Sequence, residues 1–223
     1  RQLLINTMKF SLLHIDTGGA KWIALIQTQV RIGYALDSNQ LTPQDITLSC
    51  RSLAALLGRS FSGRLYYDLR EKRGLTYGIY GQCTNAPLSS SIKFYGSTAI
   101  EHSGAFVVGI LDHLKWLTSA PVSEGELNTL KTYLIGEVLL TKDHPSQSEA
   151  QFIHQQVLGL DPQSMQAINA KLQALSPSQL MLLAQQAFHG EPLIILRGDV
   201  NKISADLTAK LPEWKLEVVK VTD

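Results

Sequence analysis

Two side chains that could act on one substrate lie seven residues apart in the stretch LREKRGLTYGIY, residues 69–80. Arg70 falls in the last turn of a predicted helix, Gly74 ends that helix, and Tyr77 opens a predicted strand. Because one tight corner joins the two elements, both side chains could point to the same side. A guanidinium and a phenol carry several hydrogen-bond donors, so the pair could hold a peptide carbonyl. Such donors could also stabilise the oxyanion that forms when a metal-bound water attacks beside them.

Ordinary structure also explains the same residue types. Arg70, Lys72 and Arg73 complement the negative end of the helix dipole, and we interpret the last two as plain helix-end charges. Tyrosine is common in strands, so Tyr77 needs no special role. The residue types and their spacing therefore leave both interpretations of the corner open.

A zinc site made by this chain alone is not predicted. Two zinc-binding histidines on one helix stand close in sequence, as in H-E-x-x-H or H-x-x-E-H. No two histidines of the chain have that spacing, Pro145 separates His144 from Glu149, and no Cys-x-x-Cys occurs. The histidines are His14, His102, His113, His144, His154 and His189.

Motifs for nucleophilic or phosphate chemistry are also missing. The sequence contains neither the G-x-S-x-G of serine hydrolases nor the G-x-x-x-x-G-K-[ST] loop of phosphate binders. The glycine-bounded run 58–63 lacks the lysine and fits the end of one helix and the start of another, with Ser60 and Ser62 as candidate caps. Glu124 and Glu126 stand at a predicted helix start, where capping and solvent contact explain them better than acid–base catalysis.

The composition is that of an ordinary globular protein. The 223 residues are 44% hydrophobic and 17% charged, with a formal net charge of +1, and can build a sizeable core. The balanced charge argues against nucleic acid or an anionic membrane surface as partner, and no run of about 18 apolar residues occurs. The chain begins with Arg1 instead of Met, which favours a processed or excised chain, so a missing signal sequence says little about location.

The corner is flanked by predicted helices and strands that must position it. A strand is predicted over 22–36, followed by a helix that begins at Pro43 with Thr42 as its cap and ends at Gly58. The short helix that carries Arg70 comes next. Two strand-like runs, TYGIYGQCTN and SSSIKFYGST, then predict an antiparallel hairpin.

Helices dominate the remainder of the chain. The apolar spacing and the caps predict helices near 107–117, 124–138, 146–158, 165–172 and 177–188, then a buried strand at 192–199, a final helix and a final strand. Residues 1–20 have no clear pattern and end in a turn at 16–19. The order predicts an α+β fold, a single antiparallel (mixed) β-sheet with helices mainly on one face, in one domain over residues 1–223.

The two cysteines fall on predicted elements of this core. Cys50 lies on the apolar face of the first helix and Cys83 in a predicted strand. Two buried free thiols are the favoured interpretation, and a disulfide is left open. Two cysteines do not decide the redox compartment.

The stretch LLGRSFSGRLYYDLREKRGLTYGIYG, residues 56–81, closely resembles a known segment. It is similar to the LGG-x-x-SRL-x-x-x-LRE-x-x-GLAYSV of the pitrilysin/insulinase family of inverted-motif zinc peptidases, which includes mitochondrial processing peptidase. QTQVRIGYAL, PVSEGELNTLKTYLIGEVLL and LSPSQLMLLAQQAF with PLIILRGD extend the resemblance over about residues 22–200. Arg59, Gly63 and Thr76 depart from the family pattern as small or exposed-type changes, and none is part of the Arg70/Tyr77 pair.

The resemblance implies a half-domain of the mitochondrial-processing-peptidase/LuxS-like metallohydrolase type. Family members have two similar halves, of which the first carries H-x-x-E-H with two zinc-binding histidines and a glutamate base. The second half lacks zinc ligands and carries an Arg/Tyr pair. By resemblance this chain is the second, non-catalytic half, and Arg70 and Tyr77 bind the substrate backbone and help hold the tetrahedral intermediate.

The same resemblance implies the partners. No cofactor is expected in this chain, because zinc and the base would come from an H-x-x-E-H half, either a separate subunit or the N-terminal half of the same gene product. The other partner is a peptide substrate that adds as a strand to a sheet edge. A bacterial envelope or periplasmic location is expected, with the cytoplasm as the alternative.

Two other functions compete with this one. The chain could be a structural or assembly subunit of the same fold, as the core proteins of the respiratory bc1 complex are, or an unrelated peptide-binding module. The intact Arg70/Tyr77 pair favours the peptidase half, since a purely structural subunit needs neither residue.

Overall fold

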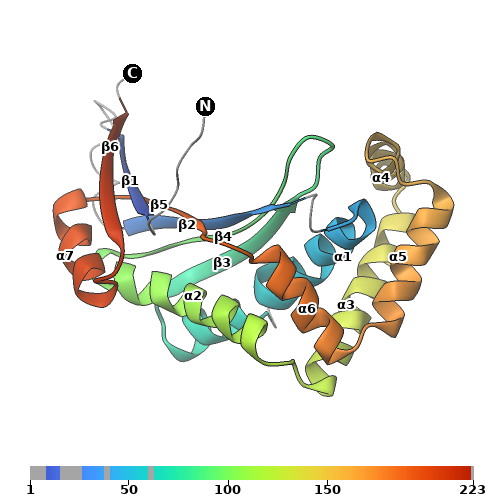
Figure 1. Ribbon diagram of the computed structural model, residues 1–223, viewed down its shortest axis with the longest axis horizontal. Coiled ribbons are helices and arrows are strands. Elements are labelled where there is room, and N and C mark those ends of the chain that lie inside the picture. Colours follow the sequence, from blue (N-terminus) through green and yellow to red (C-terminus); the bar gives the residue numbers. More distant parts are fainter. Residues whose placement is uncertain (1–8, 16–26, 38–40, 60–62, 222–223) are drawn as a thin grey trace.

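The computed structural model describes residues 9–15, 27–37, 41–59 and 63–221, which form one mixed six-stranded sheet with helices packed against it (Figure 1). The strand order is β3-β4-β2-β5-β1-β6, and β1 runs parallel to β5 and β6 whereas the other pairs are antiparallel. The strands are β1 Lys9–Ile15, β2 Gln27–Leu36, β3 Thr76–Thr84, β4 Ser90–Ala99, β5 Leu193–Arg197 and β6 Lys215–Val221.

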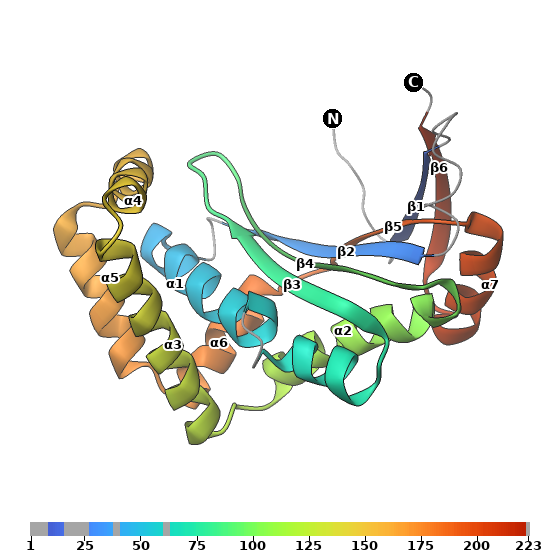
Figure 2. The ribbon, with the colours of Figure 1, turned by 180° about the vertical axis from the view of Figure 1, so that it is seen from behind.

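The helices gather on one face of the sheet, as the views from the front and from behind both show (Figures 1 and 2). α1 and α2 lie directly beneath the strands, α3, α4 and α5 stand together at one end, and α7 lies beside β6 at the other. The helical segments are α1 Pro43–Ala54, η1 Ala55–Arg59, η2 Tyr66–Lys72, η3 Ile100–His102, α2 Ser103–Ser119, α3 Glu124–Lys142, α4 Pro145–Val157, α5 Pro162–Ala174, α6 Pro177–Ala187 and α7 Val200–Lys210.

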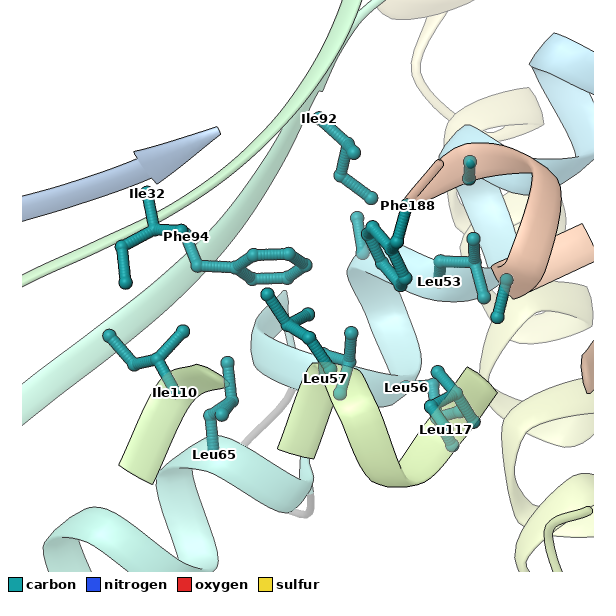
Figure 3. Packing of buried hydrophobic residues seen from close by; sticks show 14 of the residues in the cluster. Ile32, Leu53, Leu56, Leu57, Leu65, Ile92, Phe94, Ile110, Leu117 and Phe188 are labelled. Atoms are coloured by element: carbon teal, nitrogen blue, oxygen red, sulfur yellow. The ribbon is translucent and has the colours of Figure 1, made fainter. Parts of the chain in front are cut away.

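The core fills the space between the sheet and this helix layer. Along β2, exposed and buried residues alternate, and Val30 and Ile32 are fully buried. Phe94 of β4 lies among Leu57, Ile110 and other apolar side chains of the helix layer (Figure 3). Because successive side chains of a strand point to opposite faces, one face of the sheet is dry and the other stays open.

Most of the predicted elements are confirmed, including the α+β class, the hairpin and the caps of α1, α3 and α6. Thr42 caps α1 with Pro43 in its first turn, and Ser176 and Gln179 form a complete capping box at α6. The strand β1 was missed by the sequence patterns. The predicted turn at 16–19, the candidate caps Ser60 and Ser62, and the first part of the 22–36 strand lie outside the described residues.

The prediction that Gly58 ends the first helix was wrong. α1 continues into the π-helical turn η1, which runs through Arg59. A side chain at Gly58 would place its Cβ 2.7 Å from the backbone nitrogen of Gly81 in β3. Glycine is therefore needed there for the close approach of helix and strand, not for a helix end.

The prediction of two free thiols was also wrong, because Cys50 of α1 and Cys83 of β3 form a disulfide. Their Cα atoms lie 5.2 Å apart, within the normal range for a disulfide. Cys50 is on the buried face of α1, and that face packs against β3, so folding brings the two thiols together.

Together with α4, the C-terminal part of α3 presents an exposed apolar surface, whereas Leu127, Leu130 and Leu134 nearer the start of α3 belong to the core. α4 buries none of its described side chains. The exposed large apolar side chains of the two helices are Ile135, Leu139, Leu140, Phe152, Ile153 and Val157. Among the described helices, none combines the length and the apolarity that crossing a bilayer requires.

Candidate functional site

A tight corner connects the helix η2 to the edge strand β3. Gly74 has a φ of +61°, in the left-handed region that glycine adopts without strain. Its N–H donates to the carbonyl of Arg70 over 3.1 Å, and the N–H of Leu75 donates to the carbonyl of Leu69 over 2.8 Å. This closed helix end reverses the chain, as the sequence predicts, so that Tyr77 follows Arg70 after a single turn.

The corner brings Arg70 and Tyr77 to one hollow in the surface. A cavity of about 550 Å³ is lined by both residues, by Thr76 and by His102 at the start of α2. Tyr77 is 87% exposed, and the Arg70 side chain is 39% exposed. Both side chains are thus accessible to a ligand in the same space.

A β-bulge directs Tyr77 toward the open face. Thr76 pairs with Thr98 and Ile79 pairs with Gly96, so Tyr77 and Gly78 together stand opposite one residue of β4. The extra residue changes the alternation, which leaves Thr76 and Ile79 buried while Tyr77 faces outward. Bulges commonly redirect a side chain next to a functional site.

The hydroxyl of Thr76 holds the bulge in place. It lies within donating distance of the carbonyls of Ser97, at 2.6 Å, and of Gly78, at 2.8 Å. It also accepts from the N–H of Gly78 over 3.1 Å. Thr76 is 8% exposed, so of the two interpretations, a small or an exposed-type change, only the small one fits: the bulge turns the side chain inward.

Arg70 is oriented by its neighbours on η2. Its guanidinium carbon lies 4.6 Å from the centre of the Tyr66 ring, and its Nε lies 3.5 Å from a carboxylate oxygen of Glu71. Stacking on an aromatic ring limits the motion of a guanidinium and leaves its in-plane donors available. The contact with Glu71 is exposed on both sides, so it holds Arg70 only loosely.

An ionic cluster fixes η2 to the helix layer. The Asp68 carboxylate accepts from Arg73 over 2.6 Å and lies 2.8 Å from Nε2 of His113 in α2. Burial alone would raise the pKa of Asp68, but the hydrogen bonds with His113 and Arg73 outweigh it and hold that pKa below its usual value. Arg73 is therefore not a plain helix-end charge, as the sequence interpretation had it, but part of the anchor of the helix that carries Arg70.

A second anchor stands at the start of this helical segment. Arg64 donates through two nitrogens to Glu126 of α3, and its guanidinium lies 3.8 Å from the centre of the Trp116 ring in α2. Ser123 caps α3 as predicted, but the Glu126 carboxylate binds Arg64 instead of facing solvent. Sequence patterns could not find this pair, because 62 positions separate its members.

The donor set for a metal is absent from the described part of the chain. Across residues 9–15, 27–37, 41–59 and 63–221, no group of three His, Cys, Asp or Glu side chains could hold a metal ion. The candidate site is accordingly a site of hydrogen-bond donors: a phenol and a guanidinium beside an open sheet face.

The fold and the sequence together identify the family of the chain. Residues 22–134 match the family model of the peptidase M16 inactive domain, and the chain belongs to that family. The resemblance to the pitrilysin-like zinc proteases is thereby confirmed. The curated "Uncharacterized zinc protease YmxG" of Bacillus subtilis is 25% identical over 133 residues, which are 60% of this chain and 32% of the relative.

Solved structures confirm the fold. A protease from Helicobacter pylori aligns with a TM-score of 0.73 at 18% identity, over 86% of this chain and 44% of that one. A peptidase M16 inactive domain from Pseudomonas fluorescens aligns with a TM-score of 0.66 at 21% identity, over 85% of this chain and 44% of that one. The periplasmic protease PqqL of Escherichia coli aligns with a TM-score of 0.63 at 14% identity, over 86% of this chain and 21% of that one. The chain thus spans less than half the length of these relatives.

Proposed function

We propose that this chain is the substrate-binding, non-catalytic half of a zinc metalloendopeptidase. The observation that carries the proposal is the shared hollow: Arg70 and Tyr77 reach it from two different elements, on either side of Gly74. A phenol and a guanidinium on one rigid corner fit a peptide carbonyl better than they fit a purely structural role, because neither is buried.

The proposed chemistry is hydrogen-bond donation to the substrate. The Tyr77 hydroxyl and the Arg70 guanidinium would donate to the backbone carbonyl near the scissile bond. Their bonds would strengthen as that oxygen gains negative charge in the tetrahedral intermediate, which accelerates the reaction. The edge position of β3 supports binding of the peptide as an added strand, because the outer backbone groups of an edge strand are free to pair.

The proposal requires a second half. We infer that residues 1–223 form one half-domain, with a core over about 22–200, and that zinc and the general base belong to an H-x-x-E-H half. That half would be a separate subunit or the N-terminal half of the same product. The partial coverage of the longer relatives supports this arrangement.

A location in the bacterial envelope or periplasm is part of the proposal. The disulfide between Cys50 and Cys83 supports an oxidising compartment. The fold is shared with PqqL of Escherichia coli, which is described as a periplasmic protease. A fully reduced pair in protein taken from cells would favour the cytoplasmic alternative.

A second candidate function is an assembly subunit of the same fold without a role in proteolysis. The exposed apolar side chains of α3 and α4 favour it, because surfaces of that kind commonly mark protein interfaces.

The test uses the complete enzyme with its zinc-binding half. Tyr77→Phe and Arg70→Ala should each lower kcat by about 10²-fold, as the loss of one oxyanion donor does, with unchanged folding. Tyr67→Phe and Lys72→Ala are matched controls on η2, outside the hollow, and should leave kcat unchanged. Wild-type kinetics in both Tyr77→Phe and Arg70→Ala would remove the pair from the mechanism and favour the assembly function.

The isolated chain provides a further check. It should neither bind zinc tightly nor cleave peptides. Stoichiometric zinc in the purified chain, with peptidase activity that a chelator abolishes, would contradict the proposal.

A further inference from the structure

A diagonal row of cations crosses the open face of the sheet. It consists of Lys93 on β4, Arg31 on β2 and Arg197 on β5, which we call the cation row. The register places Arg31 opposite Tyr95, two residues along β4 from Lys93. It also places Arg31 opposite Ile195, two residues along β5 from Arg197. Each cation is thus the diagonal neighbour of the next, which corresponds to about 7–8 Å between backbone positions.

The four strands around the cation row, β3, β4, β2 and β5, carry no compensating carboxylate. Glu217 of β6, which the register places on the same face, is separated from β5 by β1. The ion pairs found among the described residues do not include any member of the row. Like charges on neighbouring strands repel each other, so an anionic ligand on this face would relieve a cost that the folded chain bears.

The cation row is continuous with the donor corner. A second cavity of about 340 Å³ lies on the open face and is lined by Arg31, by the stacked rings of Tyr80 and Tyr95, and by Tyr77. Lys93 extends its ammonium group to 6.0 Å from the centre of the Tyr95 ring. Because Tyr77 lines both cavities, one path leads from the corner over the tyrosines to Arg31, the central cation of the row.

We propose that the cation row binds an acidic segment of the peptide substrate, so that the protease prefers peptides carrying Asp or Glu beside the cleaved bond. The inference rests on the proposed function, because the path begins at the Arg70/Tyr77 corner. A peptide fits better than a nucleic acid for two reasons. The row holds only three cations in a chain of net charge +1, and it leads to donors for a backbone carbonyl.

The test measures binding of charge-matched peptides to the complete enzyme, with a chelator present to prevent cleavage. Three fluorescent peptides of one sequence would carry Asp and Glu, the corresponding amides, or Lys at the same positions. Anisotropy should give the lowest Kd for the acidic peptide, and this preference should shrink as salt rises.

Variants of the cation row should remove the preference. Lys93→Gln, Arg31→Gln and Arg197→Gln should each weaken binding of the acidic peptide by about two- to fivefold, and the triple variant by about tenfold or more. Binding of the amide peptide should not change. Lys115→Gln, an exposed lysine on the opposite, helical layer, is the control for charge alone and should have no effect.

The outcomes separate this inference from the proposed function. Equal Kd values for the three peptides, or a triple variant that keeps the acidic preference, would overturn the inference even if Tyr77→Phe lowers kcat. Competition by a single-stranded DNA of equal charge, as strong as that of the acidic peptide, would overturn it too. Loss of the preference in the triple variant, with kcat retained on the amide peptide, would support it.

Discussion

Removal of the Thr76 hydroxyl should disturb the bulge that directs Tyr77. Thr76→Val keeps the shape of the side chain but deletes the donor to Ser97 and the acceptor for the N–H of Gly78. An unpaired buried polar group costs about 1–3 kcal/mol, and both partners here are only half-buried. We therefore expect a loss of about 1–2 kcal/mol in the free energy of unfolding, measured by urea titration.

The same substitution should affect turnover more than substrate affinity. A displacement of about 1 Å at a reacting group can cost about 10²-fold in rate, so a partly relaxed bulge should lower kcat by about tenfold with little change in KM. Thr76→Ser keeps the hydroxyl and should retain most of the activity. Thr132→Val removes an exposed helical hydroxyl of α3 and serves as the control for the substitution itself.

The result that would refute this reasoning is specific. If Thr76→Val unfolds at the same urea concentration as the parent and keeps its kcat, the hydroxyl does not hold the bulge. If stability falls but kcat does not, the bulge does not position Tyr77 for the reaction.

Three further perturbations test the anchors of the site. Reduction of the Cys50–Cys83 disulfide, which spans 33 residues of chain, should destabilise the protein by about 4 kcal/mol in denaturant titrations. The double Cys→Ser variant should not respond to the reductant, and an equal response would contradict the assignment. Because the pKa of Asp68 is lower in the folded than in the unfolded state, its ionised form stabilises the fold above about pH 4. That stabilisation is lost as the pH falls through the folded pKa. Asp68→Asn should therefore reduce the fall of the melting temperature toward acidic pH, and an unchanged fall would exclude this role. Gly81→Ala would place a Cβ 2.7 Å from the carbonyl of Ala54 and should lower stability by about 1–3 kcal/mol, whereas Gly125→Ala on open α3 should be neutral or stabilising.

Local signals predicted most of the elements correctly. Thr42 with Pro43, and Ser176 with Gln179, are caps that act within one turn, so the sequence carries all the information about them. The corner at Gly74 is equally local, because a left-handed residue after an amphipathic helix needs no distant partner. The placement of Arg70 and Tyr77 on either side of this corner was therefore predictable. That the two side chains act together as donors could be stated as a hypothesis from the sequence.

β1 illustrates what local patterns miss. The segment KFSLLHI lacks a clear alternation, so no periodicity marks it as a strand. It becomes one because it pairs in parallel with β5 and β6, which follow about 180 residues and more later in the chain. Parallel pairing between distant segments has no signature in either segment alone.

The amino-acid sequence by itself determined the helices, the hairpin and the tight corner that bears Arg70 and Tyr77, because caps, glycine conformation and apolar spacing act between near neighbours. Only the tertiary structure decided the bulge at Thr76, the Cys50–Cys83 disulfide and the anchoring of Asp68 by His113. It also decided the cation row. Each of these depends on the register of strands or on the packing of a helix against a sheet, and those contacts join residues that are far apart in the chain.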